Sequence, residues 1–343
     1  MASPYAGLGR AAFWRNAVAE GDPAGDADLY RPRLKITPKT QIFTAGSCFA
    51  QHVTRALQGA GCSVIDTEPV TPGLPADLTR AFGYGQYSAR FGNIYTLRQF
   101  RQLIEEALGQ FIPACRIWTK DTRFYDALRP AVEPEGFGSE AAVQLARGAH
   151  LQAVLQALRQ ADLLVFTLGL TECWEHLESG TVYPTAPETL AGTYDPKVFG
   201  FRNLTYEDCI EDFIALRGLL AQINSDLRFL LSVSPVPLIA TASGNHVMAA
   251  STHSKAILRA VCGALYDADP AVDYFPSYEL VTAPRREGGH WFEANMRSVS
   301  AEGVTRVMGT FLAAHGLTAE AMPEVETADE MQCEEILLEA FAK

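Results

Sequence analysis

The sequence predicts an α/β protein with three layers, in which a mainly parallel β-sheet is covered by helices on both faces. Short apolar runs that are typical of strands alternate with longer segments whose apolar residues recur at helical spacing. Residues 162–168 are almost continuously apolar, which is typical of a strand buried on both of its faces. Alternation of strands and helices favours parallel strands joined by helical crossovers.

The expected elements follow one another along most of the chain. Strands are expected at residues 40–45, 63–66, 162–168, 228–234 and 272–275. Amphipathic helices are expected at residues 49–59, 97–108, 139–161, 206–223, 249–265 and 300–315. Two stretches rich in proline, glycine and aromatic residues, 118–138 and 180–200, interrupt this pattern. They are either walls of a substrate cleft or surface loops that pack onto the body of the protein.

Three regions are expected from these patterns. Residues 1–39 form an irregular lead-in, residues 40–316 form the α/β domain, and residues 317–343 form an acidic tail. The tail ends in a short stretch of apolar residues at 336–341, either a helix that packs back onto the domain or an interaction segment.

Composition excludes several classes of function. The chain has 343 residues and a formal net charge of −12, which argues against binding to nucleic acid or to an anionic membrane. No apolar stretch is long enough to cross a bilayer, and no signal peptide is recognisable. The seven cysteines are scattered without a Cys-x-x-Cys pair, so we expect a reducing, cytoplasmic environment and no structural zinc.

The most informative segment is the turn that follows the first expected strand. Gly46, Ser47 and Cys48 stand between an apolar strand and an amphipathic helix. Unpaired N–H groups and the helix dipole favour negative charge at a helix N-terminus, so Cys48 is expected to have a lowered pKa and to act as a nucleophile. The alternative is a simple turn that contains a buried thiol.

Residues 46–50 read GSCFA, and the chain resembles the family named after that signature. Further similar blocks occur in order at residues 90–96, 166–172, 232–237 and 274–279. The resemblance implies membership of the SGNH (GDSL-like) hydrolase superfamily and a flavodoxin-like arrangement of the sheet. That superfamily contains esterases, lipases, carbohydrate deacetylases and O-acyltransferases.

The same resemblance suggests which residues surround the reacting atoms. It implies Cys48 as nucleophile, or Ser47 if the motif is matched one residue earlier. Gly92 and Asn93 correspond to the oxyanion block, unless they only form a tight turn. In the third block Thr171 replaces the usual asparagine, and the following Glu172 could contact substrate or cap the next turn.

The chain departs from the superfamily pattern at the catalytic histidine. Residues 295–298 occupy the place of the Asp-x-x-His turn but contain neither aspartate nor histidine. Arg297 in this turn could bind a carboxylate or phosphate. A base must therefore come from elsewhere, and His246 is preferred over His52 and His290. No set of histidines, cysteines and carboxylates predicts a metal site.

Two functions are consistent with these observations. The first is an esterase or O-acyltransferase that acts on a carbohydrate or a small ester or thioester, with acetyl as one candidate acyl group. It would require no cofactor, although acyl-CoA could be a co-substrate. The second is a binding or assembly protein that kept the fold and lost the catalytic machinery. The sequence predicts a small-molecule or glycan partner and leaves the oligomeric state open.

Overall fold

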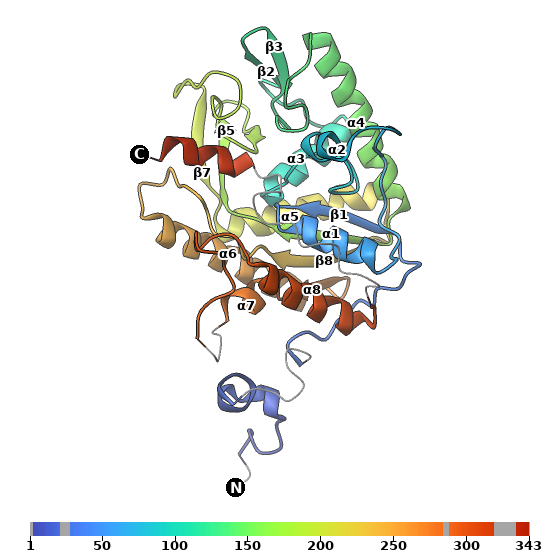
Figure 1. Ribbon diagram of the computed structural model, residues 1–343, viewed down its shortest axis with the longest axis vertical. Coiled ribbons are helices and arrows are strands. Elements are labelled where there is room, and N and C mark those ends of the chain that lie inside the picture. Colours follow the sequence, from blue (N-terminus) through green and yellow to red (C-terminus); the bar gives the residue numbers. More distant parts are fainter. Residues whose placement is uncertain (1–2, 21–27, 284–287, 319–333, 343) are drawn as a thin grey trace.

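The central sheet of the protein is parallel, as the sequence predicts. In a computed structural model that describes residues 3–20, 28–283, 288–318 and 334–342, four strands form this sheet in the order β1-β4-β8-β9 (Figure 1). They are β1 (Ile42–Gly46), β4 (Leu163–Leu168), β8 (Arg228–Val233) and β9 (Val272–Phe275). Every neighbouring pair is parallel, and residues of all four strands are buried on both sides of the sheet.

The expected strand at residues 63–66 is reduced to one residue. Val64 forms a single parallel bridge with Ile42, on the side of β1 that faces away from β4. If the segment at Val64 is counted as the second strand, the spatial order of the five strands is 2-1-3-4-5, which is the order of flavodoxin-like sheets. In such sheets ligands bind where the first and third strands diverge. Here that position lies between the carboxyl ends of β1 and β4.

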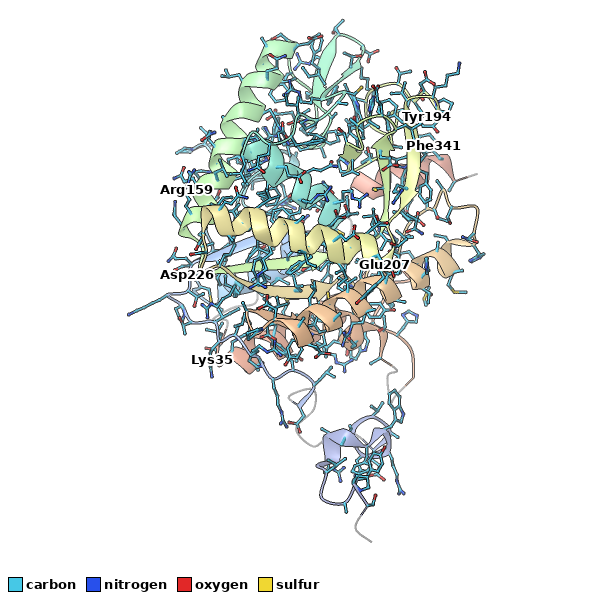
Figure 2. The ribbon with its side chains drawn as sticks, turned by 180° about the vertical axis from the view of Figure 1, so that it is seen from behind. Lys35, Arg159, Tyr194, Glu207, Asp226 and Phe341 are labelled. Carbon is cyan, nitrogen blue, oxygen red and sulfur yellow. The ribbon has the colours of Figure 1, made fainter. Side chains whose placement is uncertain are left out.

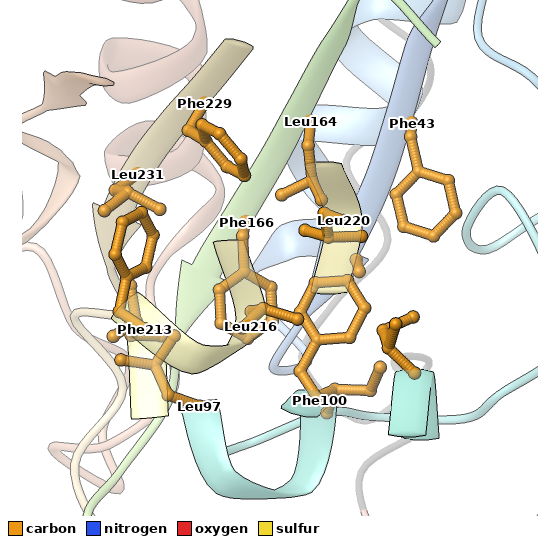
Figure 3. Close-up of a cluster of buried hydrophobic side chains, with 14 of the residues drawn as sticks. Phe43, Leu97, Phe100, Leu164, Phe166, Phe213, Leu216, Leu220, Phe229 and Leu231 are labelled. Carbon is orange, nitrogen blue, oxygen red and sulfur yellow. The ribbon is translucent and has the colours of Figure 1, made fainter. Parts of the chain in front are cut away.

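Helices cover both faces of the sheet, which confirms the three-layer prediction. One face is covered by α3 (Leu97–Ala107), α4 (Glu140–Gln160), α5 (Tyr206–Ile223) and α6 (Val247–Ala268). The other face is covered by α1 (Ala50–Gly59), α7 (Ser277–Thr282) and α8 (Ala301–His315). Figure 3 shows part of the face covered by α3 to α6, where Phe166 of β4 lies beside Phe100 of α3 and Leu216 of α5. Burial of these apolar surfaces is the main force that holds the layers together.

Local signals in the sequence explain where several helices begin. Thr96, Ser139 and Ser300 each accept a hydrogen bond from a backbone N–H in the first turn of α3, α4 and α8. Thr205 and Asp208 form a reciprocal capping box at the start of α5. These side chains bond to N–H groups that have no partner within the helix. Each of these helices therefore begins after a serine or threonine, a residue type that favours a helix N-terminus.

Both stretches that the sequence left as loops contain small antiparallel sheets. The first holds a hairpin of β2 (Ile117–Lys120) and β3 (Arg123–Asp126). The second sheet lies after β4 and extends beyond residues 180–200 on both sides. It consists of β5 (Glu172–His176), β6 (Val182–Tyr183) and β7 (Phe199–Asn203), in the order β6-β5-β7. The sequence does not predict these strands because they are short and are stabilised by pairing with one another.

Four shorter segments complete the described elements. They are α2 (Ala76–Ala81) and the helical turns η1 (Arg10–Ala12), η2 (Arg15–Ala19) and η5 (Glu334–Phe341). Figure 1 shows the N-terminal turns well away from the central sheet, whereas η5 lies beside β5 and β7. None of the helices among the described residues is long and apolar enough to cross a membrane.

Gly46, the last residue of β1, lies unusually close to β4. Its φ angle is +142°, and a Cβ atom built on it would lie 2.5 Å from the carbonyl oxygen of Thr167. Any side chain at this position would push the two strands apart. Glycine is therefore required where β1 turns into the segment that leads to α1.

We expect Gly46→Ala to lower the free energy of unfolding by about 3 kcal/mol or more, because the new methyl group meets the backbone of β4 and the φ angle becomes strained. Gly218→Ala is the matched control, since Gly218 lies within α5 and a Cβ atom placed there would meet no heavy atom within 4 Å. That change should stabilise the protein by about 0.5–1 kcal/mol. Urea unfolding of both variants measures the difference, and equal midpoints would contradict the assignment of Gly46.

Candidate functional site

A small pocket lies at the carboxyl ends of the central strands. Its walls include Ser47 and Cys48 after β1, Tyr95 before α3 and Gly169 after β4. Ser234 after β8 and Lys255 of α6 complete the wall. The loops that follow residues 45, 91, 168 and 234 therefore meet at one edge of the sheet.

The turn at Ser47 and Cys48 is buried and well fixed. Ser47 is 2% exposed and Cys48 is 6% exposed. The Ser47 N–H donates to the Thr167 carbonyl oxygen (3.0 Å), and the Ser47 carbonyl accepts from the Ala50 N–H (2.8 Å) at the start of α1. The Ser47 Oγ atom has no hydrogen-bond partner among the described residues. A buried hydroxyl without a partner is costly for stability, and such groups are found at sites that bind or react with a ligand.

Asn93 and Tyr87 support this turn from behind. The Tyr87 hydroxyl lies within hydrogen-bond distance of both the Ser47 carbonyl oxygen (3.0 Å) and Asn93 Oδ1 (2.7 Å). The Gln51 amide also donates to Asn93 Oδ1, and the Gln99 amide donates to the Asn93 carbonyl oxygen. The position of the turn thus depends on a buried polar cluster between α1 and the start of α3.

Gly92 and Asn93 lie in this supporting layer. Gly92 has a φ angle of +70°, which favours glycine, and Asn93 is buried beside Tyr87. Tyr95, from the same sequence block (residues 90–96), lines the pocket. Its carbonyl oxygen accepts hydrogen bonds from the Gly169 and Leu170 N–H groups. Tyr95 belongs to a block that resembles the family pattern, but the sequence alone did not identify its place in the wall.

Gly169 joins the turn at Ser47 and Cys48 to α6. A Cβ atom on Gly169 would lie 2.9 Å from the Cβ atom of Ser47, so a glycine is needed for this approach. The Gly169 carbonyl oxygen accepts a hydrogen bond of 2.5 Å from Lys255 Nζ. The ammonium group of Lys255 is therefore bound to a residue that itself touches Ser47.

Lys255 is a pocket residue that the sequence did not predict. It is 3% exposed, which is rare for lysine, because a buried ammonium loses its hydration. It lies on the buried stripe of α6 that includes Ser251, Ser254 and Leu258. A charged residue in a helical stripe that otherwise faces the core is the signal that could have identified it.

Thr171 and Glu172 follow Gly169 but lie outside the small pocket. Thr171 is fully buried, and its hydroxyl donates to Asn203 Oδ1 of β7 (2.6 Å). Glu172 lines a larger neighbouring hollow, where its Oε1 atom accepts from the Thr241 hydroxyl (2.7 Å). Burial raises the pKa of Glu172 above its ordinary value.

The histidines that the sequence suggested as bases lie in three different surroundings. His246 is exposed at the N-terminus of α6, where its Nδ1 accepts from the Met248 N–H (3.2 Å). His52 is buried in α1 beside the ring of Phe49, and burial lowers its pKa to about 3. His290 is exposed, with Nδ1 3.0 Å from the carbonyl oxygen of Phe292. Among the described residues, no histidine contributes to the walls of the small pocket.

The turn at residues 295–298 reaches the loop that follows β8. Asn295 Oδ1 accepts from the N–H groups of Arg297 and Ser298, which closes the turn. The Arg297 guanidinium donates to the carbonyl oxygen of Pro237, a residue of the pocket wall (3.2 Å). Arg297 therefore stabilises the wall of the pocket through Pro237 and does not itself line the pocket.

Comparison with protein families identifies one match. The model of the GSCFA family matches residues 41–311, a range that contains the central sheet and all walls of the small pocket. Among curated proteins, none matches the chain.

Tyr87→Phe tests the support of the turn. The change removes the hydroxyl between the Ser47 carbonyl oxygen and Asn93 Oδ1, each of which keeps one other donor, so it should cost about 0.5–1.5 kcal/mol of stability. It should also expose the thiol of Cys48, so that iodoacetamide modifies Cys48 faster than in the unchanged protein. The rate is measured by mass spectrometry of the peptide that contains Cys48.

Tyr183→Phe is the control for this experiment. The hydroxyl of Tyr183 donates to the Ala114 carbonyl oxygen in a separate apolar cluster. We expect a similar loss of stability with no change in the modification of Cys48. If both variants expose Cys48 equally, the support assigned to Tyr87 is wrong.

Proposed function

The chain belongs to the GSCFA family, and from this premise and the geometry of its pocket we propose that the protein is an acyl-transfer enzyme, an esterase or O-acyltransferase of SGNH type. The observation that carries the proposal is a pair of nucleophilic side chains, Ser47 and Cys48, in one small pocket with the ammonium group of Lys255. A nucleophile, a preorganised positive charge and a helix N-terminus are what an acyl-transfer site requires.

The proposed reaction begins at Cys48. Its thiolate attacks the carbonyl carbon of an ester or thioester, such as an acyl-CoA, and forms a carbon–sulfur bond. The charge that develops on the carbonyl oxygen is stabilised by the ammonium group of Lys255. The bond to the alcohol or thiol of the donor then breaks, and that leaving group takes the proton that the candidate base His246 received from the thiol of Cys48. The hydroxyl of a carbohydrate or small molecule, or a water molecule, next gives its proton to His246 and attacks the thioester carbon, so that the carbon–sulfur bond breaks and the thiolate of Cys48 is restored.

A thiol nucleophile suits this site better than a serine. A thiolate forms more readily than an alkoxide and is favoured by a nearby cation, so it depends less on a strong Asp–His pair. The turn at residues 295–298, which contains neither aspartate nor histidine, is consistent with that reduced need. None of the six cysteines in the described part of the chain forms a disulfide, which is consistent with the proposed location in a reducing cytoplasm.

Two residues are candidates for proton transfer. Lys255 lines the pocket, whereas His246 begins the same helix two turns earlier and lies at the surface. We propose Lys255 as the group that stabilises negative charge, and we keep His246 as the candidate general base from the sequence. Their separate positions make the two roles separable by mutation.

A second function, a binding protein without catalysis, is favoured by one observation. The place of the SGNH Asp-x-x-His turn holds Asn295, Met296, Arg297 and Ser298, and the described histidines all lie outside the walls of the pocket. Such a protein would bind the acyl compound and leave it unchanged.

The first prediction concerns a covalent intermediate. In a Cys115→Ser background, which removes the exposed cysteine of the described residues, incubation with activated esters or acyl-CoAs should add one acyl group to Cys48. Intact-mass and peptide mass spectrometry locate it. Cys48→Ala should abolish the adduct, and Ser47→Ala should retain it. The reverse pattern would transfer the role to Ser47, and the absence of any adduct or turnover with every donor would support the binding protein.

The second prediction concerns charge and proton transfer. Lys255→Met should lower the rate of acylation by about a hundredfold, because the developing oxyanion loses its cation. Lys197→Met is the control, since Lys197 is exposed, and it should leave the rate unchanged. His246→Ala should slow turnover by about a hundredfold and remove an ionisation from the pH–rate profile if His246 is the base. An unchanged rate in Lys255→Met would reject its assigned role.

A further inference from the structure

A larger hollow adjoins the small pocket. It lies between the β5–β7 sheet, the loop around Pro184 and the segment before α6. Leu170 and Leu238 line both the hollow and the small pocket, so the two spaces share a wall and lie next to each other.

The surface of this hollow is mainly apolar. Leu170, Trp174, Ala186, Phe201 and Leu238 contribute to it, and the ring of Trp174 is held edge-on by Tyr194 (5.4 Å) and Phe201 (6.0 Å). A rigid aromatic and aliphatic wall of this kind gains free energy by removing hydrocarbon from water.

Two hydroxyl groups of the hollow are hydrogen-bonded to the protein. The Thr241 hydroxyl donates to Glu172, and the Thr185 hydroxyl donates to the carbonyl oxygen of Ala186 (3.2 Å). A sugar ring needs donors and acceptors that turn toward it, because its hydroxyl groups lose water on binding. The mainly apolar lining therefore favours a hydrocarbon chain over a sugar.

The C-terminal helical turn contributes the last part of the wall. Leu338 of η5 lines the hollow, and Figure 1 shows η5 beside β5 and β7. Figure 2, seen from behind, places Phe341 at the same end of the molecule as Tyr194 and away from Lys35. A segment distant in sequence therefore covers the hollow with an apolar side chain.

We propose that this hollow binds the hydrocarbon chain of the acyl donor, so that the preferred acyl group is a medium-length fatty acyl chain rather than acetyl. This inference rests on the proposed acyl transfer at Cys48. The carbonyl group lies in the small pocket beside Lys255, and the chain passes Leu170 and Leu238 toward Trp174. The size of the acyl group is then set by the β5–β7 sheet and by η5.

A series of thioesters tests this inference. Acetyl, butyryl, hexanoyl and octanoyl thioesters are compared by kcat/KM, and the value should rise by about tenfold or more from acetyl to octanoyl, because each methylene removed from water favours binding. Ala186→Trp should fill the hollow and lower kcat/KM for the octanoyl thioester toward the value for the acetyl thioester. Ala141→Trp, on the exposed start of α4, is the control and should keep the preference.

Binding of free octanoate gives a readout that needs no catalysis. Calorimetric titration should detect octanoate binding to the unchanged protein and to Cys48→Ala, and should detect none with Ala186→Trp. If no ester reacts but octanoate binds in this pattern, the acyl-transfer proposal fails and the hydrocarbon site stands. Equal rates for acetyl and octanoyl esters, or binding of sugars without octanoate, would overturn the hydrocarbon site while acyl transfer stands.

Discussion

The close approach of two strand ends is the constraint on which the site depends. Gly46 brings β1 so near to the backbone of Thr167 that no side chain fits between them, and Gly169 allows the same closeness one step later. The two glycines place Ser47 against the end of β4. The diverging ends of neighbouring parallel strands leave a crevice in sheets of this order. The contact of Ser47 with the end of β4 therefore places Ser47 at the base of that crevice. Tyr87 and Asn93 then hold the turn from the side of α3.

The pocket combines burial with charge in a way that ordinary core packing would avoid. A lysine ammonium group deep in the protein is costly unless it is held by polar atoms, and Gly169 supplies one carbonyl oxygen. The same low-dielectric surroundings strengthen the attraction between that ammonium and any negative charge in the pocket. A group that weakens the free protein is thus well placed to stabilise an anion formed during a reaction, which is the general logic of preorganised sites.

Most of the scaffold could be predicted from the sequence, because its central strands are buried runs and its helices carry regular apolar stripes. The approximate positions of β1, β4, β8 and β9 and the convergence of their loops follow from those patterns. The β5–β7 sheet could not be predicted, since its strands are short, lie in a stretch rich in proline and glycine, and are stabilised by pairing with each other. Lys255 was missed because a lysine in a helix is normally solvated, and its burial arises only from tertiary packing.

The β5–β7 sheet also bears on the order in which the protein is made. Its three strands lie within residues 172–203, so their pairing needs only local chain, and it can form early as the chain leaves the ribosome. The small pocket draws residues from Ser47 to Lys255 and needs β8 in place beside β4. A nascent chain that ends before α6 can therefore contain the paired β5–β7 strands but not the small pocket. The pocket is complete only after most of the domain has been synthesised.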